Sequence, residues 1–283
     1  MPTIPDSPLQ VPNRVAFVGG GNMARSLIGG LIRDGVTPAN VSVSEPNAEL
    51  RAALARDFGI AAHSGNTEAA GDATALVLAV KPQVMKDVCE GLSALVQQRK
   101  PLIVSIAAGI RIAQLEQWLG GDVAVVRAMP NTPALIGAGA TAACANARVS
   151  AAERALAQSI LGAAGMFAWI DTEAAMDSVT ALSGSGPAYF FLLVEALEEA
   201  AVAQGLPRET ARALAAQTCL GAGRMLREDG AAPAELRRRV TSPGGTTQAA
   251  LDSFAQDHFG EIVARAVAAA TRRGGELSAQ FGH

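Results

Sequence analysis

Short apolar runs alternate with amphipathic segments through the first part of the chain. Runs of strand length cover residues 15–18, 41–44, 76–80, 102–105 and 123–127, and helical patterns fill the gaps between them. Such alternation predicts parallel strands joined by crossover helices. Two further runs, 139–144 and 166–170, flank a predicted helix over 151–164 and extend the sheet. We therefore expect an α/β fold with a doubly wound, Rossmann-like sheet.

Strand patterns end near Asp171, and long alanine-rich helical patterns continue from there to Arg273. The segment 187–204 is apolar on two sides, since Phe191 and Leu192 widen the stripe that Phe190 and Leu193 begin. A helix of this kind needs two partners, which predicts burial against a second subunit. The expected organisation is a leader at 1–13, a dinucleotide-binding domain at 14–171, and an all-α helical substrate and dimerisation domain at 172–283.

Composition excludes several classes of function. The 283 residues carry a formal net charge of −3, and the three arginines at 237–239 stand without an aromatic-rich basic stripe, so we expect no nucleic-acid partner. No apolar run is long enough for a membrane span, and the start of the chain lacks the features of a secretory signal, which predicts a cytoplasmic protein. The three cysteines and three histidines form no metal-binding spacing, and we expect no metal.

A glycine turn follows the first apolar run. Gly19, Gly21 and Ala24 have the GxGxxA spacing, between a predicted strand and a helical pattern over 24–34. In a dinucleotide site the first glycine permits the tight turn, the second admits the pyrophosphate, and the third small residue lets the helix pack on the strand. Glu45 ends the second predicted strand, close to the distance expected for a ribose contact.

A second small-residue loop, residues 240–247, precedes a helical pattern that begins at Thr247. The first amides of a helix have no helical partner and carry a partial positive charge, so such a loop binds anions, here a carboxylate. The alternative is an ordinary Pro-Gly turn with a threonine cap.

Taken together, these motifs resemble the pyrroline-5-carboxylate reductase family from about Arg14 to the last helix. Further matching pieces follow predicted strands at residues 79–82, 105–109 and 127–133, and another is the segment Leu182-Ser183-Gly184-Ser185-Gly186-Pro187-Ala188-Tyr189. The carboxyl ends of strands are where an open α/β sheet binds its ligands.

The resemblance implies reduction of the cyclic imine 1-pyrroline-5-carboxylate to L-proline, the last step of proline biosynthesis, by hydride from a nicotinamide cofactor. It implies that the Thr247 hydroxyl contacts the ring nitrogen and that the amides of Gly245, Thr246 and Thr247 hold the carboxylate. The implied substrate-binding residues are Ser183, Ser242, Gly244, Gly245, Thr246 and Thr247. Ser183 and Ser185 have an equally good structural interpretation as caps of the helix that follows.

By the same resemblance, a further set of residues contacts the cofactor, from the pyrophosphate to the nicotinamide. These are Gly19, Gly21, Asn22, Met23, Ala24, Ser44, Glu45, Asn47, Asn66, Val80, Lys81, Pro82, Ala107, Ala108 and Asn131. Lys81 alone would be an ordinary surface cation. The family also implies a dimer, with a ring of dimers as a further level of assembly.

Two positions depart from the family pattern. Arg238 stands where an acid is usual, which puts any salt bridge of that acid in doubt. Glu45 bears on the cofactor: a carboxylate facing the ribose favours NADH, whereas an outward carboxylate leaves Ser44 and Asn47 free for the 2′-phosphate of NADPH. From the sequence we expect NADPH by a small margin, with NADH as the alternative.

Other functions stay open at this level. A related imine reductase and a β-hydroxyacid dehydrogenase share the fold. Hydroxyacid chemistry usually needs a lysine or histidine, whereas the second domain has no lysine and only His258 and His283, which argues against it. An alternative from a different class is a non-catalytic dinucleotide-binding regulatory protein. The complete carboxylate-binding loop at residues 240–247 argues against a regulator, because a regulator would not need to hold a substrate carboxylate.

Overall fold

The structure is a computed structural model that describes residues 13–280. The chain packs as two compact units, the first built from residues up to Gly184 together with those from Ala270 onward, the second from Ser185–Ala269. The predicted leader falls outside the described residues, apart from Asn13.

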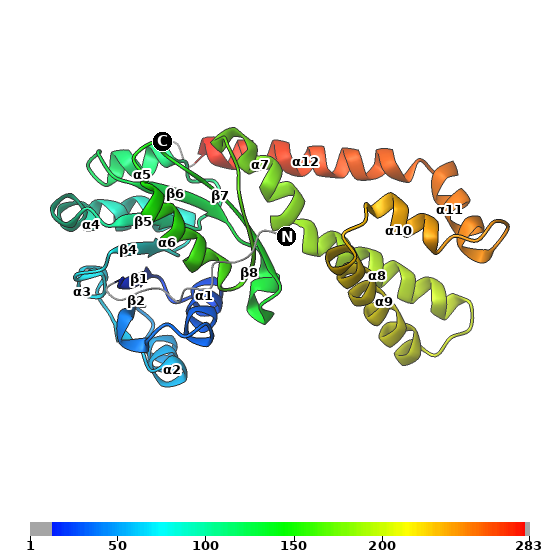
Figure 1. Cartoon of the computed structure of the whole chain (residues 1–283), viewed down its shortest axis with the longest axis horizontal. Helices are drawn as coiled ribbons and strands as arrows, with labels where there is room; N and C mark the ends of the chain where they lie inside the picture. The colour runs from blue at the N-terminus through cyan, green and yellow to red at the C-terminus, as the bar shows by residue number, and fades with distance from the viewer. Residues whose placement is uncertain (1–12, 281–283) are drawn as a thin grey trace. The chain divides into compact units, whose positions relative to one another are not determined.

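One eight-stranded sheet forms the centre of the first unit, in the order β3-β2-β1-β4-β5-β6-β7-β8 (Figure 1). Its strands are β1 Val15–Val18, β2 Val41–Ser44, β3 Ala61–His63, β4 Ala75–Leu78, β5 Leu102–Ser105, β6 Val125–Met129, β7 Gly139–Ala145 and β8 Gly165–Trp169. The predicted doubly wound sheet followed by a helical segment is confirmed.

Two details of the sheet differ from the expectation. Strand β3 has no counterpart in the predicted list, because three residues at the sheet edge carry no apolar run. Strand β7 runs antiparallel to β6, whereas β8 is parallel to β7. Only a short link with a 3₁₀ turn at Thr132–Ile136 joins β6 to β7, too short for a crossover, while helix α6, Ala151–Gly162, makes the crossover to β8.

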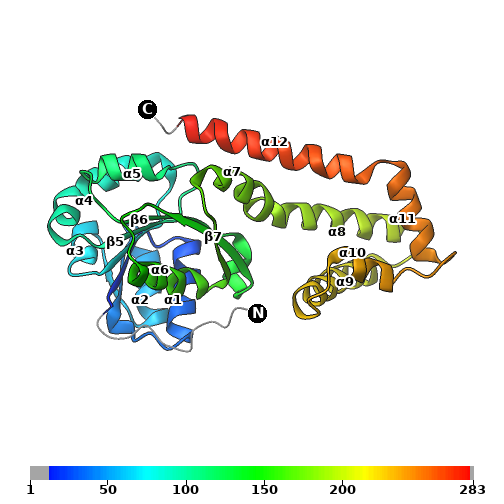
Figure 2. The ribbon, with the colours of Figure 1, turned by 45° about the horizontal axis from the view of Figure 1, so that its top comes forward.

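Helices cover both faces of the sheet (Figure 2). One face packs against α1 Asn22–Arg33, α2 Ala48–Phe58 and α6, and the other against α4 Met85–Arg99 and α5 Ile112–Trp118. Two short helices, α3 Asn66–Ala70 and α7 Met176–Val179, each bury a residue in the second core. Alternation along β1 divides its side chains, with Val15 and Phe17 in the first core and Ala16 and Val18 in the second. A strand buried on both sides is apolar throughout, which is why the sequence pattern located it.

Local signals fix the helix starts. The Asn47 side chain accepts hydrogen bonds from the amides of Glu49 and Leu50, both at 3.0 Å, and α2 ends before Gly59. Ser150 and Glu153 form a capping box at the start of α6. These caps define where α2 and α6 begin.

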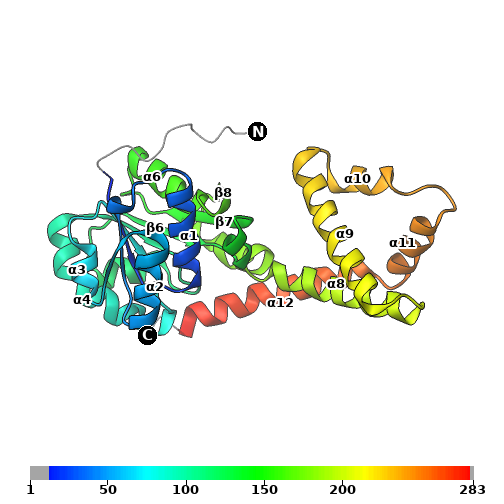
Figure 3. The same cartoon turned by 90° about the horizontal axis from the view of Figure 1, so that it is seen from below.

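The second unit is helical in all its regular elements. Helices α8 Gly186–Ala203 and α9 Arg208–Glu228 pack together (Figure 3), followed by α10 Pro233–Arg239, α11 Thr246–Gln256 and the first part of α12 Phe259–Gln280. Glu198 on α8 accepts hydrogen bonds from Arg212 and Arg208 on α9, and these guanidinium groups lower the pKa of its carboxyl. Phe190, Phe191 and Leu192 are 59%, 68% and 65% exposed in the single chain, as expected for a helix that a second subunit covers.

No helix among residues 13–280 is both long and apolar enough to cross a membrane. The packing assigns residues 172–184 to the first unit, although they follow the last strand. A domain boundary at Asp171 stays a prediction from the sequence.

A part-buried ion pair ties three elements of the first unit together. Arg127 on β6 donates to Glu173 at 2.9 Å, and the same carboxylate oxygen accepts the Ile112 amide at the start of α5 at 2.8 Å. The Arg127 side chain is only 4% exposed, so its charge depends on this partner.

We predict that Glu173→Ala lowers the free energy of unfolding by about 3 kcal/mol, because it leaves a buried guanidinium unpaired. The matched control is Glu228→Ala, which breaks the exposed Arg224–Glu228 pair of α9 and is expected to cost about 0.5 kcal/mol. Urea denaturation at one fixed protein concentration measures both. Equal losses in the two variants would contradict the structural role of Glu173.

Candidate active site

The glycine turn lies between β1 and α1. Gly19 has a φ of +97°, and a Cβ added there would lie 2.9 Å from the carbonyl oxygen of Ala79, so only glycine fits without strain. The Gly19 amide donates to the Ser44 carbonyl at 2.9 Å, which fixes the turn against β2. Nothing lies within 4 Å of a Cβ added to Gly21, so this side of the turn is open.

Helix α1 begins directly after the turn. Its N-cap, Gly21, contributes no side chain, so the first amides, those of Asn22, Met23 and Ala24, have no helical partner. Ala24 is buried where the helix packs on the sheet, as predicted for the third small position. An open glycine next to unpaired amides suits a pyrophosphate, and the chain therefore fits a dinucleotide at this turn.

Glu45 faces the glycine turn. One carboxylate oxygen accepts the Gly20 amide at 2.9 Å, the other accepts the Asn47 amide at 2.9 Å, and the residue is 9% exposed. The carboxylate is thus fixed beside the turn rather than pointing outward. The Gly20 contact could not be predicted from the sequence, because it joins residues 25 positions apart.

Ser44, Asn47 and Asn66 each use a side-chain oxygen in a hydrogen bond within the protein. The Ser44 hydroxyl donates to Asn66 Oδ1 at 2.8 Å, and Ser44 is 1% exposed. Asn47 uses its side-chain oxygen to cap α2. Of the polar groups predicted to meet a 2′-phosphate, the Ser44 hydroxyl is therefore already committed.

The loops after β4 and β5 reach the same edge of the sheet. Val80, Lys81 and Pro82 follow β4, with Lys81 exposed, and Ala107 and Ala108 follow β5, with Ala107 buried and Ala108 exposed. Since β4 and β5 are parallel neighbours, their carboxyl ends lie side by side.

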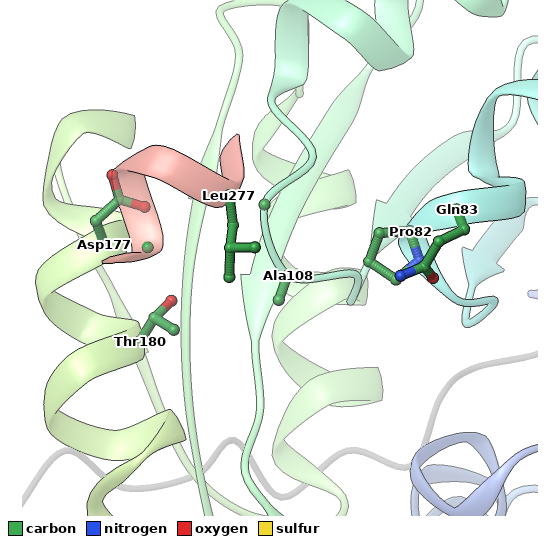
Figure 4. A pocket seen from close by; sticks show the side chains of 8 residues that line it. Pro82, Gln83, Ala108, Asp177, Thr180 and Leu277 are labelled. Atoms are coloured by element: carbon green, nitrogen blue, oxygen red, sulfur yellow. The ribbon is translucent and has the colours of Figure 1, made fainter. Parts of the chain in front are cut away.

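A cavity of about 220 Å³ opens beside these two loops (Figure 4). Pro82, Gln83, Ala108 and Gly109 line one side. The other side is lined by Asp177, Thr180, Gly274 and Leu277, from α7, the π-helical turn Thr180–Gly184 and the end of α12. The sequence did not indicate this second set, because no local pattern links α7 to a helix that ends about a hundred residues later.

Asn131 lies two residues beyond β6 and is 9% exposed. Its side-chain oxygen accepts the Ala140 amide at 2.8 Å, and its amide nitrogen donates to the Ser183 carbonyl at 2.9 Å. The structure therefore brings Asn131 and Ser183, both predicted site residues, into direct contact.

The carboxylate loop belongs to the second unit. Gly244 has a φ of +68°, the Gly245 amide donates to the Ser242 carbonyl at 3.0 Å, and α11 begins at Thr246, one residue earlier than predicted. Among the described residues, the amides of Thr246, Thr247 and Gln248 have no hydrogen-bond acceptor. These three amides, rather than that of Gly245, remain for an anion.

The arginines before this loop are partly neutralised. Arg238, in the position where an acid is usual, forms a two-bond contact with Glu235, and Arg239 pairs with Glu235 and Asp229. The guanidinium of Arg238 is the main cause of the lowered pKa of the Glu235 carboxyl. The positive charge of Arg238 is thus paired with an acidic side chain of the same unit.

Two of the cysteines, Cys89 and Cys144, are buried in the first unit. Burial raises the pKa of Cys89 to about 12 and that of Cys144 to about 11, so both thiols stay protonated at neutral pH. Among residues 13–280 no group of His, Cys, Asp and Glu is arranged to hold a metal ion.

Comparison with known proteins gives matches over nearly the whole chain. Residues 173–277 match the family model "Pyrroline-5-carboxylate reductase dimerisation", and residues 14–109 match "NADP oxidoreductase coenzyme F420-dependent". A pyrroline-5-carboxylate reductase of Pseudomonas aeruginosa is 53% identical over 269 residues, covering 95% of this chain and 98% of the relative. One from Haemophilus influenzae is 42% identical, covering 94% and 98%.

Two solved structures are similar in fold as well. A pyrroline-5-carboxylate reductase of Coxiella burnetii superposes with a TM-score of 0.91 at 42% identity, covering 94% of this chain and 98% of that one. A pyrroline carboxylate reductase of Plasmodium falciparum with NADP bound has a TM-score of 0.81 at 30% identity, with the same coverage.

We predict that Gly21→Ala leaves the melting temperature unchanged but weakens NADH binding by about tenfold or more, equivalent to about 1.4 kcal/mol. The added methyl meets no protein atom within 4 Å, so only a bound pyrophosphate would collide with it. Gly91→Ala is the matched control, since that glycine also has open space around it but lies within α4. Fluorescence titration with NADH measures the affinities, and equal affinities in both variants would exclude the glycine turn as the binding site.

Proposed function

The chain belongs to the pyrroline-5-carboxylate reductase family, and from that premise we propose how its own residues carry out the reaction. The protein reduces 1-pyrroline-5-carboxylate to L-proline with hydride from a nicotinamide cofactor, which is the last step of proline biosynthesis. The observation that carries the proposal is a pair of helix N-termini with unpaired amides. One, at α1, suits a pyrophosphate and the other, at α11, suits a carboxylate.

The direct test is oxidation of the reduced cofactor, followed by its absorbance, in the presence of 1-pyrroline-5-carboxylate. We expect substrate-dependent oxidation with proline as the product. A folded protein that binds cofactor without turnover would instead support the regulatory alternative.

Binding of the two anionic groups orients the reactants. The amides at the start of α11 hold the substrate carboxylate, which determines the ring face that the imine carbon presents. When bound, the reduced cofactor supplies the hydride. The imine nitrogen gains a proton as the carbon gains hydride, so a hydrogen-bond donor near nitrogen lowers the barrier. We assign that donor to the Thr247 hydroxyl, which is half-buried and makes no side-chain hydrogen bond among the described residues.

Thr247→Ala is expected to lower kcat on the order of a hundredfold, because it removes a donor to the reacting nitrogen. The cofactor affinity should stay within about twofold, since Thr247 lies outside the glycine turn. Thr247→Ser keeps the hydroxyl and should restore most of the rate. Ser253→Ala, an exposed hydroxyl on the same helix, is the matched control. Unchanged turnover in Thr247→Ala would remove Thr247 from the mechanism.

The finer question is which nicotinamide cofactor the protein prefers. The NADPH preference expected from the sequence depended on an outward Glu45 that leaves Ser44 and Asn47 free for the 2′-phosphate. The inward carboxylate at Gly20 and the committed Ser44 hydroxyl support the alternative. A carboxylate held beside the turn accepts a ribose 2′-hydroxyl and repels a 2′-phosphate. We therefore propose that NADH is preferred and that NADPH is used less well.

Glu45→Ser should shift the ratio of kcat/KM for NADPH over NADH upward by about tenfold, or about 1.4 kcal/mol. Removing the carboxylate ends its repulsion of a 2′-phosphate. Glu49→Ser removes the same charge from an exposed position four residues later and should leave the ratio unchanged. If both variants gave the original ratio, Glu45 would play no part in the choice of cofactor.

Self-association follows from the dimerisation segment over residues 173–277. The exposed apolar side chains of α8, among them Phe190 and Phe191, support a dimer in which this helix is covered. We propose a helix-exchanging dimer and, beyond it, a ring of dimers. We also propose the cytoplasm as its location, supported by two buried unpaired thiols, which suit a reducing compartment.

A further inference from the structure

Asn131 joins three segments of the first unit that meet at the carboxyl edge of the sheet. Its oxygen receives the Ala140 amide near the start of β7, and its nitrogen donates to the Ser183 carbonyl in the π-helical turn Thr180–Gly184. These partners lie 9 and 52 residues away along the chain. With both polar ends committed and 9% exposure, the side chain is oriented by the protein itself.

The turn that Asn131 holds is an unusual element. A π-helical turn is less stable than an α-helix and is frequent at functional sites. Here Thr180 and Ser183 direct their hydroxyls to the carbonyls of Met176 and Val179, four residues back, at 2.9 and 3.0 Å. Bonds of this kind bend a helix rather than straighten it, so the turn depends on outside support.

Support for the turn comes from the end of β6 and the residues that follow it. Besides the Asn131 bond, Met129 packs against Gly184, where an added Cβ would lie 2.7 Å from the methionine methyl. The turn ends at Gly184, the last residue of the first unit before the chain continues into α8.

We propose that Asn131 is a positioning residue, which holds the π-helical turn and Ser183 in the geometry that substrate reduction requires, instead of binding the nicotinamide through its amide. The proposal rests on the reductase function given above. It assigns Asn131 a role different from the cofactor contact expected by resemblance. Loss of the Ser183 bond should therefore affect turnover while cofactor affinity is retained.

The chain offers a matched control at the opposite end of the same two strands. Asn146 follows β7, its oxygen accepts the Val125 amide at 3.2 Å, and its nitrogen donates to the Val123 carbonyl at 2.9 Å. It links β6 and β7 as Asn131 does, but at the edge away from the predicted site. Asn146→Ala thus measures how the loss of a structural asparagine alone changes stability and turnover.

The experiment compares Asn131→Ala, Asn131→Asp and Asn146→Ala with the unchanged full-length protein. Asn131→Asp is the sharpest variant, because it can still accept the Ala140 amide but cannot donate to the Ser183 carbonyl. For both Asn131 variants we expect kcat to fall on the order of tenfold to a hundredfold, as displacement of a site segment does. Their dissociation constants for NADH, titrated without substrate, should stay within about twofold. Asn146→Ala should lower the melting temperature without changing kcat.

Hydrogen exchange of the segment around Ser183 gives a readout that does not depend on activity. Faster exchange there in Asn131→Asp, but not in Asn146→Ala, is the expected result. NADH affinity that weakens in step with kcat would show that Asn131 binds the cofactor, and kcat values equal to the control's would show a purely structural role. Either result overturns the proposal. Failure of the reductase function itself would appear separately, as absence of turnover in the unchanged protein.

Discussion

Parallel strands bring their carboxyl ends to one edge of a sheet, and the arrangement of the site depends on this property of β1 to β6. Strands β2, β1, β4, β5 and β6 end there in succession. Each contributes a different element: Glu45, the glycine turn, the loop at Pro82, the loop at Ala108, and Asn131. Residues that are far apart in the sequence thus lie along one edge of the sheet.

In the proposed mechanism, backbone amides do most of the binding that the reaction requires. The unpaired amides at the starts of α1 and α11 suit the two anionic groups, the pyrophosphate and the substrate carboxylate. Reduction of an imine needs hydride, a proton at nitrogen and correct orientation, but no nucleophile. The protonated thiols of Cys89 and Cys144 are consistent with that requirement. The protein therefore contributes chiefly by orientation, with one hydroxyl, that of Thr247, as the proposed donor.

The sequence predicted those features that depend on neighbouring residues. Strand β4 is buried at every position, so its apolar run is visible in the sequence, and Asn47 caps the helix that begins at the next residue. Contacts between residues that are far apart in the sequence could not be predicted. The orientation of Glu45 is determined by Gly20, 25 residues away, and that of Asn131 by Ser183, 52 residues away. Strand β3 was missed because three residues at a sheet edge need no apolar pattern. The roles of the individual substrate-binding residues remain predictions.

Transfer of the hydride itself tests the central claim most directly. The protein is supplied with 1-pyrroline-5-carboxylate and NADH that carries deuterium at both C4 positions, and the proline formed is analysed by mass spectrometry. The account predicts L-proline with a single deuterium, on the ring carbon that was the imine carbon. Unlabelled proline, or cofactor oxidation without proline, would contradict direct reduction of the imine by the nicotinamide.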